Sequence, residues 1–295
     1  MRIAHITDIH VMEPPRFTQL WGKRAMGSVN LFVLGRKSKF SRRVQEALAE
    51  AVLNQSPDAV LFTGDATAQA TEEEFESFKR LYGPVFSRQP SAAIPGNHDT
   101  YTQRTYRSRA IEDHLSEWTG KGSWPRLHLL GDKLACIGVD ACRAHIFSSG
   151  KVDKDQLARL DKMLHSSAVQ DRELFILIHY PLRDRRGDPY GPSGRALSNA
   201  REVETVLLKH SHRIRAILHG HEHHGYQTAL EDGDKRIPIL NPGSSGYAWT
   251  PDKDRTAHFN VYTLSEGTLA IERFRYDGER DGFFPEPGGA YATGR

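Results

Sequence analysis

Six short apolar runs alternate with segments of helical periodicity over the first three quarters of the 295-residue chain. Runs of this length suit buried β-strands and are too short for helices. Strands that alternate with helices favour a layered α/β fold, because helices between the strands cover the faces of the sheet. The predicted strands are Arg2–Thr7, Ala59–Thr63, Ala92–Pro95, Leu134–Val139, Leu174–His179 and Ile214–His219.

The segments between these strands carry helix signals. Ser41 is a candidate N-cap for a helix that follows it. Thr71 and Glu74 have the spacing of a capping box, in which each side chain bonds the backbone N–H of the other residue. Leucine and valine stripes predict two further helices, over 157–164 and 203–207.

After His223 the pattern changes to strand-like pieces without a long helix, which predicts a second, largely antiparallel sheet. Residues 278–295 are rich in glycine and proline, so we expect a flexible C-terminal tail there. Residues 1–277 contain no obvious linker and are interpreted as a single α/β domain. The later strand-like pieces are Tyr226–Leu230, Arg236–Leu240, Phe259–Leu264 and Thr268–Phe274.

Polar residues follow five of the six predicted strands, at the carboxyl ends where α/β sheets bind ligands. Each group alone has a plainer explanation, since turns favour Gly, Asn and Asp, and a histidine after an apolar run is often a hydrogen-bonded core residue. As an ordered set at strand ends, they indicate one site. The groups are Asp8 and His10, Gly64-Asp65, Gly96-Asn97-His98-Asp99, His179, and His219-Gly220-His221.

Seven of these residues are candidate metal ligands. Oxygen and imidazole donors together suit Mn, Fe or Zn, and the lack of thiolates argues against a structural zinc site. Seven donors are too many for one tetrahedral ion and suit two ions that share a carboxylate. Such a pair of ions activates water for in-line attack on phosphorus. The candidate ligands are Asp8, His10, Asp65, Asn97, His179, His219 and His221.

The ordered series Asp-x-His, Gly-Asp, Gly-Asn-His-Asp, His and Gly-His-x-His resembles the calcineurin-like metallophosphoesterases over Asp8 to His221. The resemblance implies a four-layer αββα sandwich, in which two mixed β-sheets lie face to face with helices outside. It also implies two divalent metal ions, with manganese favoured and iron, zinc or a mixed pair as alternatives. The implied ligands are Asp65 as the bridge, Asp8, His10 and His221 on one ion, and Asn97, His179 and His219 on the other.

The same resemblance implies a hydrolase that cleaves a phosphodiester or a pyrophosphate with a metal-activated water. His98 would act beside the phosphate as proton donor or transition-state stabiliser, and Asp99 would orient its ring. The loop 241–246 matches a family segment near the site. His223 and His224 receive no family role, so we interpret them as part of a solvent-facing loop.

Residues 11–40 form a basic, aromatic-rich insertion directly after His10. Residues 14–45 contain eight Lys and Arg residues and no acidic one, although the whole chain has a net charge of only +3. Such a flap suits an amphiphilic anionic substrate or an anionic membrane surface, and the alternative is a flap that packs only on the protein itself. Nucleic acid is not expected, because no broad basic field exists elsewhere. The predicted substrate-binding residues are Arg16, Trp21, Lys23 and Arg24.

The favoured substrate is an amphiphilic nucleotide-sugar or lipid pyrophosphate, since the flap loosely resembles that of bacterial enzymes that cleave UDP-diacylglucosamine. The alternative is a cyclic nucleotide or another small phosphodiester. The sequence His179-Tyr180-Pro181 weakens the cyclic-nucleotide option, because that branch often has a second histidine before the proline. A non-catalytic scaffold of the same fold is disfavoured by the complete ligand set.

The expected location is the cytoplasm, where the basic flap would also fit a peripheral contact with the inner face of the membrane. The sequence has no secretory signal, and its apolar runs are far shorter than the about 20 residues of a spanning helix. Its two cysteines cannot build a disulfide framework.

Overall fold

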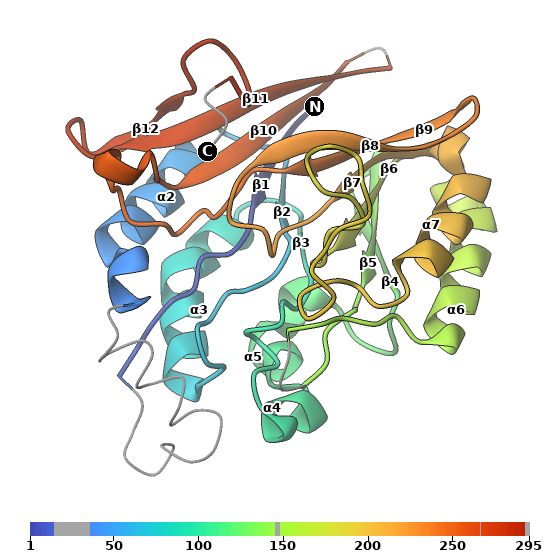
Figure 1. Cartoon of the computed structure of the whole chain (residues 1–295), viewed down its shortest axis with the longest axis horizontal. Helices are drawn as coiled ribbons and strands as arrows, with labels where there is room; N and C mark the ends of the chain where they lie inside the picture. The colour runs from blue at the N-terminus through green and yellow to red at the C-terminus, as the bar shows by residue number, and fades with distance from the viewer. Residues whose placement is uncertain (15–35, 145–147, 266, 293–295) are drawn as a thin grey trace.

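Two six-stranded mixed sheets lie face to face, and helices cover their outer faces (Figure 1). This arrangement, seen in a computed structural model that describes residues 1–14, 36–144, 148–265 and 267–292, confirms the four-layer sandwich. The helices are α2 (Arg42–Asn54), α3 (Glu72–Phe86), α4 (Gln103–Ser108), α5 (Ala110–Thr119), α6 (Lys154–His165) and α7 (Ala200–Lys209).

The first sheet has the strand order β12-β11-β10-β1-β2-β3, and the second has the order β4-β5-β6-β7-β9-β8. The strands of the first sheet are β1 (Arg2–Ile6), β2 (Ala59–Phe62), β3 (Ser91–Ala93), β10 (His258–Ser265), β11 (Thr268–Asp277) and β12 (Gly282–Pro285). Those of the second are β4 (Arg126–Leu130), β5 (Leu134–Val139), β6 (Glu173–Ile178), β7 (Ile214–Leu218), β8 (Tyr226–Asp232) and β9 (Lys235–Asn241).

Side chains alternate along the central strands between two buried faces. In β6, Leu174 and Ile176 pack in the core beneath α6 and α7, whereas Phe175 packs between the two sheets. In β1, Ile3 faces the other sheet and Ala4 faces the helices. Both faces are buried, so these strands are continuous apolar runs without polar alternation.

The helix starts agree in part with the sequence signals. The capping box is confirmed, because Thr71 Oγ1 accepts from the Glu74 N–H at 3.2 Å and the Glu74 carboxylate accepts from the Thr71 N–H at 3.2 Å. Helix α2 begins after Ser41, but the side chain of Ser41 makes no capping bond. The short elements α4, α5 and β4 were not predicted.

The strands after His223 do not form a second sheet of their own, so that prediction was wrong. Strand β9 pairs in parallel with β7, and β8 pairs with β9, so both extend the second sheet. Strand β10 pairs antiparallel with β1 and leads β11 and β12 into the first sheet. Pairing satisfies the backbone N–H and C=O groups that an unpaired edge strand would leave exposed. Which strand becomes the partner depends on which strand lies beside it in the folded chain.

Residues 278–292 are packed against the sandwich and do not form the expected flexible tail. Strand β12 pairs with β11, and beyond it the Arg273 guanidinium donates to Glu286 Oε1 at 2.9 Å with both side chains fully buried. Asn260 donates to the Tyr291 hydroxyl at 2.7 Å. A buried charge has to be paired, and the partner of Arg273 lies in this Gly- and Pro-rich segment.

The basic flap falls largely outside the described residues, and so do all four predicted substrate-binding residues within 15–35. Both ends of the insertion are anchored beside the sandwich. Val11 forms a β-bridge with Thr67, and Phe40 forms one with Tyr247. Among the helices of the described ranges, none is long and apolar enough to cross a membrane.

Candidate metal centre

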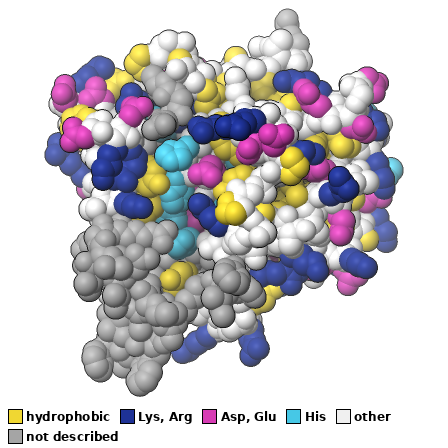
Figure 2. All heavy atoms as spheres, viewed as in Figure 1, with side chains coloured by type: hydrophobic (Ala, Val, Ile, Leu, Met, Phe, Trp, Pro, Cys, Tyr) yellow, Lys and Arg dark blue, Asp and Glu magenta, His cyan; other side chains and the backbone are white. Residues whose placement is uncertain are grey.

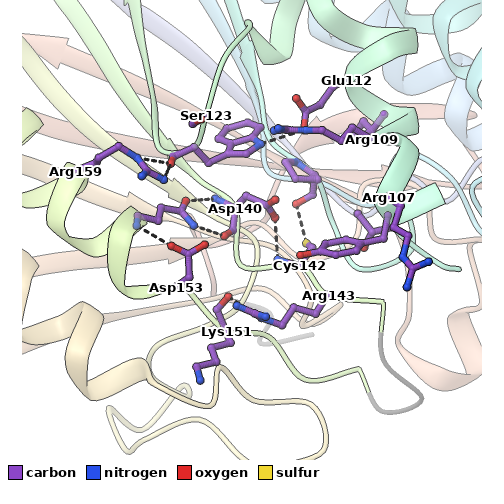
Figure 3. A pocket seen from close by; sticks show the side chains of 16 residues that line it. Arg107, Arg109, Glu112, Ser123, Asp140, Cys142, Arg143, Lys151, Asp153 and Arg159 are labelled. Atoms are coloured by element: carbon purple, nitrogen blue, oxygen red, sulfur yellow. Dashed lines mark hydrogen bonds and ion pairs between the residues drawn. The ribbon is translucent and has the colours of Figure 1, made fainter. Parts of the chain in front are cut away.

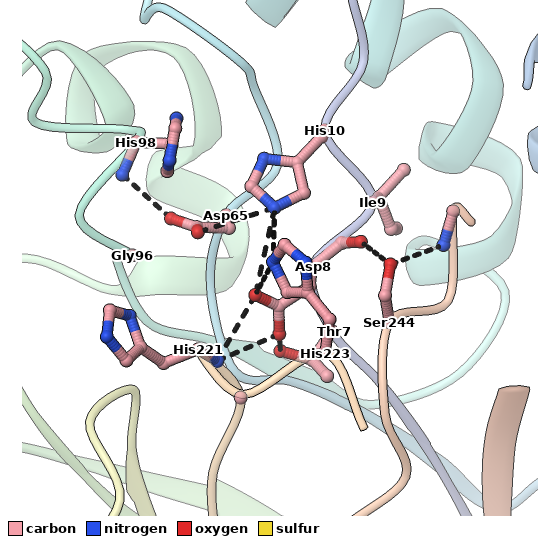
Figure 4. Close-up of polar contacts among 12 residues, drawn as sticks. Thr7, Asp8, Ile9, His10, Asp65, Gly96, His98, His221, His223 and Ser244 are labelled. Atoms are coloured by element: carbon pink, nitrogen blue, oxygen red, sulfur yellow. Dashed lines mark hydrogen bonds and ion pairs between the residues drawn. The ribbon is translucent and has the colours of Figure 1, made fainter. Parts of the chain in front are cut away.

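The loops after β1, β2, β3, β6 and β7 meet where the two sheets come together (Figure 4). The Asp8 N–H donates to the carbonyl of Gly64 at 3.0 Å, which ties the first loop to the second. His179 Nδ1 donates to the carbonyl of Thr63 at 2.7 Å, which ties the second sheet to the first. Residues far apart in the sequence therefore share one site.

Four of the candidate donor residues in these loops have a left-handed backbone. The φ angles are 50° at Asp8, 52° at His10, 61° at Asp65 and 66° at His221. A non-glycine residue held in this region costs on the order of 1–3 kcal/mol, and such residues cluster at functional sites. The strain marks these loops as shaped for the placement of their side chains.

The first cluster of donors consists of Asp8, His10, Asp65 and His223. His10 Nε2 lies 3.8 Å from Asp8 Oδ1 and 3.6 Å from Asp65 Oδ2. His223 Nε2 lies 3.4 Å from Asp8 Oδ1 and 3.2 Å from His10 Nε2. Asp8, His10 and His223 thus bring one donor atom each within 4.8 Å of one another, and Asp65 lies beside His10.

The second cluster consists of Asp65, Asn97, His179 and His221. His179 Nε2 lies 3.5 Å from Asp65 Oδ2 and 3.1 Å from Asn97 Oδ1. His221 Nδ1 lies 2.8 Å from Asn97 Oδ1. Asp65 belongs to both clusters, which is the position that the resemblance assigns to the bridging ligand.

His223 lies inside the first cluster, contrary to the interpretation of a solvent-facing loop. Its side chain is 16% exposed, and its Nδ1 bonds the Tyr247 hydroxyl at 2.7 Å, which turns Nε2 toward Asp8. His219 has its ring beside Tyr226 and its Nδ1 bonded to the carbonyl of Gly220 at 2.9 Å, and its Nε2 is buried without a hydrogen-bond partner among the described residues. Within the described ranges, no hydrogen bond or ion pair joins its side chain to either cluster. The structure therefore brings His221 and His223 to the site in the places expected for His219 and His221.

Gly220 explains this register. A Cβ atom at this position would lie 2.1 Å from Thr7 Oγ1 and 2.4 Å from Asp8 Oδ2, so only glycine lets the backbone pass. The backbone reaches the site at this glycine, so the side chains after it lie among the other candidate ligands. The sequence signal was present, because Gly-His-x-His fits Gly220 to His223 and does not fit His219 to His221, which follow a leucine.

Asp99 braces the loops and does not touch the His98 ring. Its carboxylate accepts five hydrogen bonds, from the N–H groups of Gly96, Asp65, Ala66 and Thr67 and from the Thr67 hydroxyl. The His98 ring is oriented instead by the carbonyl of Ala68, which accepts from Nδ1 at 2.7 Å. The expectation that Asp99 orients His98 was therefore wrong.

The loop 241–246 lies beside the site as expected. The Ser244 hydroxyl donates to the carbonyl of Asp8 at 2.7 Å, and the Ser245 N–H donates to the carbonyl of Thr7 at 2.9 Å. These bonds hold the backbone of the Asp-x-His turn from the side opposite to Asp65, so the loop has a supporting position.

The protonation states favour metal binding. Burial opposes the charged form of Asp65, yet the neighbouring His179 holds the pKa of its carboxyl below the usual value. Burial also opposes the charged form of Asp8, and the bonds to His10 and His223 keep its pKa well below the usual range. Burial lowers the pKa of His221, whose Nε2 has no hydrogen-bond partner among the described residues. Anionic carboxylates and neutral imidazoles are the forms that bind metals, so Asp8, Asp65 and His221 are suited to divalent ions. Burial opposes the charged form of His179, yet the Asp65 carboxylate raises the pKa of His179 to about 9, so this ring would release a proton when an ion binds.

A cavity of about 410 Å³ opens over the two clusters. Asp65, His98 and His223 line it, and so do Lys39 and Arg195. Figure 2 shows histidine side chains gathered on this face, with Lys and Arg side chains around them. The lining also contains the carboxylates of Asp65 and Glu222, so the positive charge that attracts an anionic substrate would come from bound ions together with Lys39 and Arg195.

A separate cavity of about 380 Å³ lies beyond Pro95, between α5 and α6 (Figure 3). It is lined by five basic and three acidic side chains, and by none of the donors of the two clusters. Burial raises the pKa of Asp140 in this cavity to about 6. The hydrolytic site is therefore placed at the cavity over Asp65.

The sequence pattern of the calcineurin-like phosphoesterases matches residues 1–225. The chain belongs to this family. Membership makes the protein a metal-dependent phosphoesterase, and the Asp and His clusters are the candidates for the family's dinuclear metal site. The non-catalytic scaffold is thereby set aside.

Curated relatives include two small-substrate enzymes. A probable glycerophosphodiester phosphodiesterase of Arcobacter nitrofigilis is 25% identical over 240 residues, which cover 73% of this chain and 82% of the relative. The 3',5'-cyclic adenosine monophosphate phosphodiesterase of Pseudomonas aeruginosa is 27% identical over 185 residues, which cover 60% of this chain and 59% of the relative.

Solved structures agree on the fold. A dimetal phosphatase from Danio rerio superposes with a TM-score of 0.64 at 13% identity, over 93% of this chain and 94% of the other. A purple acid phosphatase from yellow lupin superposes with a TM-score of 0.60 at 12% identity, over 96% of this chain and 52% of the other. At these identities the likeness concerns the sandwich alone.

Proposed function

We propose that the protein hydrolyses a small phosphodiester at a centre of two divalent ions, with manganese favoured. The observation that carries this proposal is the position of Asp65 between two donor clusters. Asp8, His10, Asp65 and His223 would hold one ion, and Asp65, Asn97, His179 and His221 the other. Such ions supply charge stabilisation for the phosphate oxygens and make a water more acidic.

Residues of the chain position the substrate and move the proton. Arg195 lines the cavity, and its guanidinium donates to the carbonyl of His221 at 3.4 Å. Its charge would hold the phosphate against the donors. His98 lines the cavity, and its Nδ1–H donates to the carbonyl of Ala68. Nε2 is therefore the nitrogen that would give a proton to the leaving oxygen, from the doubly protonated ring, which becomes neutral in this step.

A small phosphodiester is favoured over a lipid-linked pyrophosphate. The two curated relatives are named for glycerophosphodiesters and a cyclic nucleotide, and the described cavity is small and polar. The lipid-linked substrate and the membrane contact depend on residues 15–35, which lie outside the described residues. Both stay predictions, and the substrate panel described next tests the lipid-linked substrate.

A substrate panel tests the proposed function. Protein stripped of metal by chelation should be inactive on bis(p-nitrophenyl) phosphate and regain turnover with Mn²⁺. Glycerophosphodiesters, cyclic nucleotides and nucleotide-sugar or lipid pyrophosphates are then compared by kcat/KM. The highest value for a small phosphodiester supports the proposal. Turnover without metal would contradict the two-ion centre, and a clear preference for the lipid pyrophosphate would overturn the substrate assignment.

Replacing His98 by Gln should slow the chemical step without changing the metal content. General acid catalysis contributes about 10²–10⁴-fold, so kcat should fall within that range for a diester with an alkyl leaving group. The loss should be much smaller for p-nitrophenol, which leaves without a proton. An equal loss on both substrates would show that His98 does not protonate the leaving oxygen. Metal analysis of the variant serves as the control.

A further inference from the structure

A second group of metal-binding side chains lies on the outer layer, at the ends of α6 and α7. It consists of Asp161, His165 and His210, whose donor atoms lie within 4.8 Å of one another. All three lie outside the cavity over Asp65, and the hydrolytic mechanism uses none of them. The two helices pack side by side on the second sheet (Figure 1).

The helices bring these three residues together by their geometry. Asp161 and His165 are four residues apart on α6, so their side chains project from one face of the helix. His210 follows the last residue of α7. The rings of His165 and His210 meet edge to face, with their centres 4.4 Å apart. Both helices therefore end at the same point.

Two of the three side chains are already held in place. The His210 side chain is 5% exposed, and its Nε2 bonds Asp161 Oδ1 at 3.0 Å. His165 is exposed, and its Nδ1 donates to the carbonyl of Asp161 at 2.9 Å. A backbone carbonyl that fixes the Nδ1–H tautomer is the usual outer support of a metal-binding histidine, because it presents the lone pair of Nε2.

The electrostatic setting also favours a cation. The carbonyl ends of two helices carry partial negative charge, and here both ends face the same cluster. The bond to His210 lowers the pKa of the Asp161 carboxyl, so this ligand is anionic at neutral pH. Two neighbouring basic residues oppose the effect in part. Arg213 is occupied by the carbonyl of Leu164 at 3.0 Å, whereas Lys209 lies close enough to act on Asp161.

We propose that Asp161, His165 and His210 form a separate zinc site that ties the end of α6 to the end of α7. Two imidazoles, one carboxylate and a water from the open side complete the four-coordinate set that zinc prefers. Imidazole-rich sites favour zinc over manganese, which prefers oxygen ligands. Tetrahedral zinc needs donor atoms about 3.3 Å apart. The three donor atoms already lie within 4.8 Å of one another, so small shifts of these side chains would bring them to that spacing.

Counting bound zinc in manganese-saturated protein tests this site. Elemental analysis after dialysis against a low, fixed concentration of Zn²⁺ should find about one equivalent more in the wild type than in His165→Ala. The affinity of the variant for this zinc should fall on the order of tenfold or more, since loss of even an outer-shell partner weakens metal binding by that factor. His165 is exposed, so the variant should fold normally.

His212→Ala is the matched control, because His212 is an exposed histidine of the same turn that lies outside the cluster. It should bind as much zinc as the wild type. Zinc should also raise the melting temperature of the wild type and of His212→Ala, and not that of His165→Ala or Asp161→Asn. Equal zinc content in the wild type, His165→Ala and Asp161→Asn would overturn the proposal.

Discussion

Replacing Asp65 by Ala should abolish nearly all phosphodiesterase activity and release bound metal. The carboxylate lies 3.6 Å from His10 Nε2 on one side and 3.5 Å from His179 Nε2 on the other, so its loss disrupts both donor clusters. Metal ions supply several kcal/mol of transition-state stabilisation. If about 4 kcal/mol is lost, kcat/KM falls by about 10³-fold, at one order of magnitude per 1.4 kcal/mol.

The measurement is kcat/KM for bis(p-nitrophenyl) phosphate with saturating Mn²⁺, together with metal content by elemental analysis. Asp132→Ala is the control, because Asp132 is an exposed aspartate in the turn between β4 and β5. It should behave as the wild type. Full metal content and near-normal activity in Asp65→Ala would show that the two clusters do not depend on a shared carboxylate.

Replacing His223 by Ala should impair the first cluster, while replacing the adjacent His224 should not. His223 Nε2 lies 3.4 Å from Asp8 Oδ1, whereas the His224 side chain is exposed. Loss of an outer-shell partner of a metal already costs about 10–100-fold, so loss of a direct ligand should lower kcat/KM by at least about 10²-fold. Higher Mn²⁺ concentrations should restore part of the activity.

This pair of variants also decides between the two registers of the histidine motif. The structure predicts that His223→Ala needs more Mn²⁺ for half-maximal activity and that His219→Ala does not. The register implied by the family resemblance predicts the reverse. A melting curve of each variant controls for misfolding, since His219 is fully buried. A normal Mn²⁺ requirement in His223→Ala would remove it from the ligand set.

Local signals in the sequence were sufficient for the elements that depend on neighbouring residues. The capping box at Thr71 involves residues three apart, and the buried strand β6 is an uninterrupted apolar run. The capping box depends on hydrogen bonds between residues close in the sequence. The apolar run of β6 follows from burial of both faces of the strand, which requires apolar residues throughout. The polar residues after each strand likewise indicated the edge at which the site lies.

Local sequence signals did not predict the contacts between segments that are distant in the sequence. The partner of Arg273 is Glu286, in a segment whose glycine and proline content suggested a loose tail. The five donors around the Asp99 carboxylate are backbone N–H groups and a hydroxyl of two different loops, which no side-chain pattern reveals. The C-terminal strands are divided between two sheets, because β10 pairs with β1 across most of the chain whereas β9 pairs with the nearby β7.

The sequence by itself determined the strands, the capped helix, the family and the pool of polar residues from which the site is built. Only the tertiary structure decided which histidines of the run 219–224 enter the site. At Gly220 the backbone passes within contact of Thr7 and Asp8, so the residues after this point face the donors and His219 before it does not. The spacing His-x-His alone fits 219/221 as well as 221/223, and the glycine before His221 favours the second pair. The steric fit between two packed loops places that second pair at the site.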